Sequence, residues 1–75
     1  MATQTVNQSL SIGDIENLDE LSKKAAQLEA LLLMTCGEGG EVFRRKSDEI
    51  QENYLWSCSE IASEVSKLAQ KLTGA

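Results

Sequence analysis

One short segment rich in glycine, residues 37–40, divides the chain into two helical patterns and limits the fold more than any other feature. Glycine is a poor helix former, and it readily adopts the left-handed conformation that ends many helices. Gly37 is therefore well placed to end a preceding helix. The chain has no proline, and no other strong helix breaker lies in its middle. The sequence predicts two antiparallel helices joined by a turn at residues 37–40.

The first predicted helix covers residues 18–36. Asn17 and Glu20 have the spacing of a capping box, in which two side chains satisfy the first backbone N–H groups of a helix. Ser11 and Asp14 have the same spacing, so a start near Asp14 is the alternative. Apolar residues recur at steps of three and four and form one stripe: Leu18, Leu21, Ala25, Leu28 and Leu32.

The second predicted helix covers residues 41–72, a stretch with neither glycine nor proline. Two successive steps of four around Tyr54 interrupt an otherwise heptad-like pattern. Residues 1–17, which are mostly polar, are predicted to form a flexible arm, and residues 73–75 a tail. The stripe of the second helix consists of Phe43, Ser47, Ile50, Tyr54, Cys58, Ile61, Val65, Leu68 and Leu72.

The two predicted helices differ in length, at ~28 Å and ~48 Å for a rise of 1.5 Å per residue. When the chain folds back, the shorter helix ends opposite Glu60. Either Leu10, Ile12 and Ile15 cover the rest of the longer helix, or a second copy of the chain does. We expect a homodimer with a four-helix core, because exposed apolar surface of this extent usually marks an interface. The apolar positions left without a partner are Ile61, Val65, Leu68 and Leu72.

Large residues at two further places predict contacts with a partner. Residues 30–34 are apolar on nearly every side of the first helix, and one neighbouring helix cannot cover them. Tyr54, Leu55 and Trp56 are consecutive and cannot share one helical face, and tryptophan is enriched at interface hot spots. Trp56 either contacts another surface or is half exposed. The candidate interface residues are Leu31, Leu33, Met34, Leu55, Trp56, Ile61, Val65, Leu68 and Leu72.

The residue types argue against chemical activity. The chain has no histidine, and a Cys or Ser nucleophile usually needs one as a base, so we expect no enzyme and no catalytic residue. Cys36 and Cys58 are too few for a structural zinc site and too far apart for a disulfide, at ~20 Å along the helix axis. The glycine segment lacks the lysine and the strand of a phosphate-binding loop. We therefore expect no metal and no cofactor.

The charge balance bears on partners and location. Twelve acidic residues against seven basic ones give a formal net charge of −5, which argues against binding to nucleic acid. The one basic cluster, Arg44, Arg45 and Lys46, has acidic neighbours on both sides. No apolar stretch approaches the ~20 residues of a membrane span, and residues 1–17 lack a secretory signal. We expect a cytoplasmic protein with free thiols and no membrane contact.

Several segments carry a resemblance to a protein family. They are residues 36–40 (CGEGG) with Phe43, residues 48–51 (DEIQ) and residues 54–56 (YLW). Over residues 18–72, the chain resembles short helical-hairpin proteins of proteobacteria that have no assigned function. The resemblance implies a bacterial origin and assigns no catalytic or binding residue.

Two functions of different classes remain. The first is a non-enzymatic module for protein–protein interaction or regulation, which acts as a homo-oligomeric helical hairpin and binds another protein through an apolar surface that contains tryptophan. The second is an acidic inhibitor or nucleic-acid mimic of the kind that phages and mobile elements encode. Small size and negative charge support the second function, which requires acidic residues gathered on one face. In this sequence the basic residues are interspersed among them.

Overall fold

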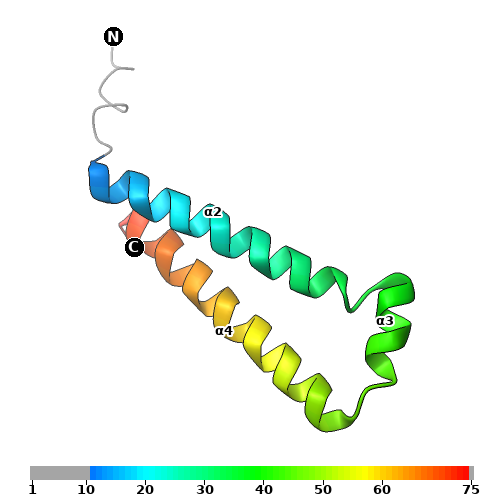
Figure 1. Cartoon of the computed structure of the whole chain (residues 1–75). Coiled ribbons are helices and arrows are strands. Elements are labelled where there is room, and N and C mark those ends of the chain that lie inside the picture. The colour runs from blue at the N-terminus through cyan, green and yellow to red at the C-terminus, as the bar shows by residue number, and fades with distance from the viewer. Residues whose placement is uncertain (1–10, 75) are drawn as a thin grey trace.

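The computed structural model describes residues 11–74, which form three α-helices and no strand. They are α2 (Ile12–Leu33), α3 (Gly37–Arg44) and α4 (Asp48–Thr73). Figure 1 shows α2 and α4 side by side in opposite directions, with the short α3 across the end that joins them. The predicted all-α class is confirmed, with three helices in place of the two that the sequence predicted.

Helix α2 begins earlier than residue 18, so the predicted start is wrong. Ser11 Oγ accepts a hydrogen bond from the Asp14 N–H at 3.0 Å, and Asp14 Oδ2 accepts one from the Ser11 N–H at 3.3 Å. The capping box therefore forms at the alternative pair of residues. The rest of the predicted arm, residues 1–10, lies outside the described residues, as does Ala75 of the predicted tail.

The glycine segment is helical, so the predicted turn at residues 37–40 is wrong. Gly37 has φ +59°, the left-handed conformation predicted for it, and the chain then continues directly into α3. Gly40 is buried where α3 meets the end of α2, and a Cβ atom there would lie 2.5 Å from the Thr35 carbonyl oxygen. The glycines thus allow a close corner between two helices.

The predicted continuous helix over residues 41–72 is also wrong, because the chain breaks between α3 and α4. Ser47 caps α4 by accepting a hydrogen bond from the Ile50 N–H at 3.2 Å. The Gln51 side-chain amide donates to the carbonyl oxygens of Arg44 at 3.3 Å and Lys46 at 2.9 Å. These bonds satisfy backbone groups that a helix end leaves free. Ile50, which the sequence placed in the stripe, is 54% exposed.

Helices α2 and α4 pack along a seam whose positions alternate at steps of three and four. This is the spacing of a coiled coil, and Gln51 removes the irregularity that the sequence showed around Tyr54. The Tyr54 hydroxyl donates to the Leu31 carbonyl oxygen, and its ring lies 5.0 Å from that of Phe43. The seam consists of Asp14, Asn17, Leu21, Lys24, Leu28 and Leu31 on α2, and of Gln51, Tyr54, Cys58, Ile61, Val65, Leu68 and Leu72 on α4.

The early start of α2 overturns the expectation that the end of α4 lacks a partner. Ile61, Val65, Leu68 and Leu72 are half-buried in the seam. With 22 residues, α2 is ~33 Å long, and Figure 1 shows its start beside the end of α4. Among residues 11–74, no helix combines the length and apolar character that crossing a membrane requires.

Candidate interaction site

The helix pair buries very little. Within residues 11–74, Cys58 is the only hydrophobic residue in the buried class, at 5% exposure. A seam between two helices leaves most of each helix surface in contact with solvent. The large hydrophobic side chains that remain exposed are Ile12, Ile15, Leu18, Leu32, Leu33, Met34, Val42, Ile50, Leu55 and Trp56.

One side of the helix pair is apolar along much of its length. In an antiparallel pair with heptad spacing, each helix places one row of residues directly after every second seam position, and the two rows share one side of the pair. On α2 this row follows Asn17, Lys24 and Leu31. On α4 it follows Tyr54, Ile61 and Leu68. All six are hydrophobic. We call this surface the apolar flank: Leu18, Ala25 and Leu32 on α2, with Leu55, Ala62 and Ala69 on α4.

The opposite side of the pair carries charge. Lys24 Nζ lies 2.8 Å from Glu64 Oε1 and 3.9 Å from Glu20 Oε2, which links α2 to α4. The hydrogen bond to Glu64 and the negative charge of that carboxylate raise the pKa of Lys24 above its usual value of 10.5. A polar hollow nearby is lined by Glu60, Ser63, Glu64 and Lys67. The two sides of the pair therefore differ in chemistry.

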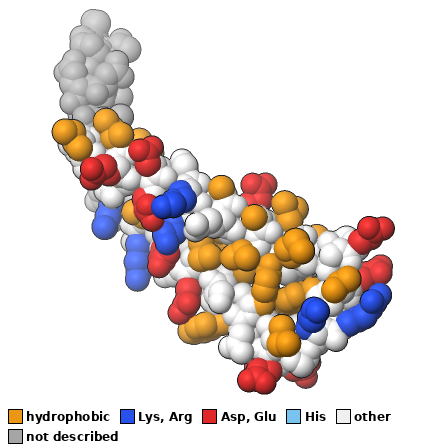
Figure 2. Space-filling view, viewed as in Figure 1, with side chains coloured by type: hydrophobic (Ala, Val, Ile, Leu, Met, Phe, Trp, Pro, Cys, Tyr) orange, Lys and Arg blue, Asp and Glu red, His pale blue; other side chains and the backbone are white. Residues whose placement is uncertain are grey.

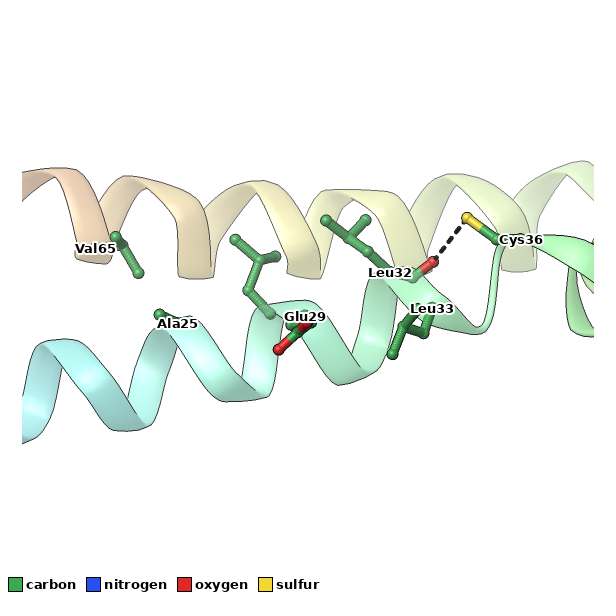
Figure 3. A pocket seen from close by; sticks show the side chains of 7 residues that line it. Ala25, Glu29, Leu32, Leu33, Cys36 and Val65 are labelled. Carbon is green, nitrogen blue, oxygen red and sulfur yellow. Dashed lines mark hydrogen bonds between the residues drawn. The ribbon is translucent and has the colours of Figure 1, made fainter.

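A pocket of about 360 Å³ opens on the apolar flank (Figure 3). In this view the Val65 side chain on α4 points toward Ala25 on α2, which shows that these two residues lie at the same level along the pair. The thiol of Cys36 donates a 3.6 Å hydrogen bond to the Leu32 carbonyl oxygen and is exposed. The lining residues are Ala25, Leu28, Glu29, Leu32, Leu33, Cys36 and Val65.

A second pocket, of about 330 Å³, lies beside α3 on the other side of the pair, and we call it the α3 groove. On the face shown in Figure 2, hydrophobic side chains gather in the half nearest α3, while charged side chains lie toward the termini and the edges. Burial raises the pKa of the Tyr54 hydroxyl above 10.0. The groove is lined by Met34, Gly39, Val42, Phe43, Lys46, Ile50 and Tyr54.

The predicted interface residues do not form one patch. Leu31 and the four residues at the end of α4 lie in the seam. Leu33 lines the pocket of the apolar flank, Leu55 belongs to that flank, and Met34 lines the α3 groove. Trp56 is 64% exposed, and its position between Tyr54 and Cys58 places it on the side of α4 away from α2.

Sequence periodicity does not predict the flank as a separate surface. It assigns Leu18, Ala25 and Leu32 to the row that faces the other helix, and it gives no prediction for Ala62 and Ala69. The flank residues could have been found from a second apolar row in the sequence, whose members directly follow every second residue of the seam.

Both cysteines are free. The part of the chain that the structure describes contains no group of three or more His, Cys, Asp or Glu residues that could hold a metal ion. Comparison with protein-family models, with curated proteins and with solved structures finds no match to this chain.

Proposed function

We propose that this protein is a non-enzymatic interaction module, a helical hairpin that associates with itself and binds another protein. One observation carries the proposal: between residues 11 and 74, only Cys58 among the hydrophobic residues is buried, while many large apolar side chains stay exposed. Chains of this size that lack a sufficient core are usually stabilised by disulfides, metals or association. Because both cysteines are free, we favour association.

Self-association would bury side chains that the single chain leaves in water. Full burial of one exposed Leu side chain contributes ~1.5–3 kcal/mol, and Leu18, Leu32 and Leu55 are still about 40% exposed. Covering all three in both copies would therefore contribute ~4–7 kcal/mol, which offsets part of the cost of binding. The apolar flank is the better face for this contact, because burying the opposite side would desolvate Lys24 and Glu64.

The α3 groove would remain open in such an assembly and is the surface that we assign to another protein. Lys46 lines this apolar groove, and Arg44 and Arg45 precede it in the sequence. An amphipathic segment with a hydrophobic anchor and acidic neighbours would match both features. Free thiols suit a reducing compartment, so we place the module in the cytoplasm.

Multi-angle light scattering over a range of protein concentrations tests self-association. We expect a mass of at least twice the 8.2 kDa of one chain at micromolar concentration. We also expect the midpoint of thermal unfolding to rise with protein concentration, because association stabilises the folded state by mass action. A well-folded monomer at all concentrations would remove the basis of the proposal.

A further inference from the structure

We infer that the second copy packs on the apolar flank in an antiparallel arrangement, with a two-fold axis that crosses the helices at Ala25. This inference rests on the proposed self-association and goes further, because it names the face and the orientation. Helix α2 of one copy would then lie along α2 of the other, and α4 along α4, so that the two α3 helices stand at opposite ends of the dimer.

The flank suits close contact between helices because it is uncharged and half of its residues are alanines. On α4, Leu55 and the two alanines of the flank are bordered by Ser59, Ser66 and Thr73, which lie one turn from them. Small side chains allow helix axes to approach to ~8 Å, the lower end of the usual range. Glu29 is the one charged residue among those that line the pocket.

Five of the six flank residues have a symmetric order. Leu18 and Leu32 lie seven residues before and after Ala25 on α2, and Ala62 and Ala69 lie at nearly equal spacing about Val65 and Ser66 on α4. Ala25 and Val65 are level with each other (Figure 3), so both helices are symmetric about the same point. An axis through that point places Leu18 on Leu32 and alanine on alanine, whereas Leu55 lies beyond the end of α4 of the second copy.

Shape supports the same axis. The pocket occupies the half of the flank toward α3, and the apolar side chains of Ile15 and Leu18 lie on the other half. The axis at Ala25 brings Leu18 of one copy over Leu32 of the other, and Ile15 next to Cys36. It also places Glu29 opposite Ser22 of the second copy. An axis parallel to the helices would instead set the two pockets against each other.

The area of the flank is sufficient for a dimer. With the axis at Ala25, α2 overlaps α2 of the second copy over residues 17–33, a length of ~25 Å, and two packed helices are ~20 Å wide, which gives on the order of 500 Å² per copy. A specific interface needs about 1,000 Å² over both partners, and the two flanks together reach that area.

Two matched substitutions test the face. In Ala25→Glu, two carboxylates would meet at the axis, and we expect the dissociation constant of the dimer to rise at least ~100-fold. Ala26→Glu puts the same residue one position later, on the side of α2 away from α4, and should leave the dimer unchanged. Light scattering gives the mass of both variants, and circular dichroism gives their helix content. A dimer that Ala25→Glu leaves intact would overturn the assignment of the face.

A distance between spin labels tests the orientation. Glu38→Cys in a Cys36→Ser background leaves Cys58, which is buried, and one exposed thiol for the label. Residue 38 lies past the end of α2, which is itself eight residues, or ~12 Å, beyond Ala25, so the crossing axis predicts labels at least ~30 Å apart. An axis parallel to the helices would place both α3 helices at one end, within ~25 Å. A short distance in a dimer overturns the orientation alone, whereas a monomer overturns the proposed function as well.

Discussion

Substitution of Gly40 by alanine tests the corner between α2 and α3. A Cβ atom on residue 40 would lie 2.5 Å from the Thr35 carbonyl oxygen, 2.8 Å from its carbonyl carbon and 3.0 Å from Arg44 Nη1. The guanidinium of Arg44 is flexible and can move away, but the Thr35 backbone is fixed by the preceding helix. The added methyl group therefore forces α3 away from the end of α2.

The expected size of the effect follows from two opposing terms. Overpacking at a site that cannot relax costs ~1–3 kcal/mol, and a shift of the backbone belongs at the upper end of that range. Alanine inside a helix regains ~0.5–1 kcal/mol over glycine. We expect Gly40→Ala to lower the free energy of unfolding by about 2 kcal/mol.

Urea unfolding followed by circular dichroism measures this change, at a protein concentration held constant among variants. Gly13→Ala is the matched control, because its nearest atom would be Ser11 Oγ at 3.6 Å, which is an ordinary contact. That variant should gain ~0.5–1 kcal/mol, since only the helix preference of alanine acts there. A Gly40→Ala protein as stable as the wild type would refute the reasoning about the corner.

Three further predictions use other parts of the fold. Ser11→Ala removes the cap of α2 and should lower the free energy of unfolding by ~1 kcal/mol in the same assay. Amide exchange in the first turn of α2 should be faster than in the wild type, and an unchanged rate would argue against the cap. Because the pKa of the Tyr54 hydroxyl is raised in the folded state, the unfolded state loses the hydroxyl proton first, and the free energy of unfolding should fall as the pH rises above 10. Tyr54→Phe also loses the hydrogen bond to Leu31, and it should abolish the part of this fall that comes from Tyr54. In dilute protein, where the proposed dimer is dissociated, Cys36 should react rapidly with a thiol reagent and Cys58 only upon unfolding. Equal rates would contradict the burial of Cys58.

The helix boundaries show what local sequence can and cannot decide. Ser11 with Asp14 and Asn17 with Glu20 are equivalent capping signals, and the choice between them depends on packing against the end of α4. Ser47 before two acidic residues is a signal for a helix start, and it could have been read from the sequence. The regular spacing of apolar residues instead favours one continuous helix with Ser47 and Ile50 in its stripe, whereas in the structure both residues face solvent.

The candidate site was harder to predict for a physical reason. Helix α2 carries two neighbouring apolar rows, one with Leu21 and Leu28 and one with Leu18 and Leu32. Periodicity alone cannot show which row faces α4, because both have the same spacing. A helix with two such rows needs two partners, so the ambiguity in the sequence and the exposed flank in the structure have the same origin.

The position of Trp56 gives the protein its own optical reporter. It is the single tryptophan of the chain, and it stands on the outer side of α4, away from both the seam and the apolar flank. Pairing of two copies through the flank would leave the indole in water and its emission unchanged. A blue shift in that emission would instead signal another molecule on the outer surface of α4, so fluorescence separates the two kinds of association without any label.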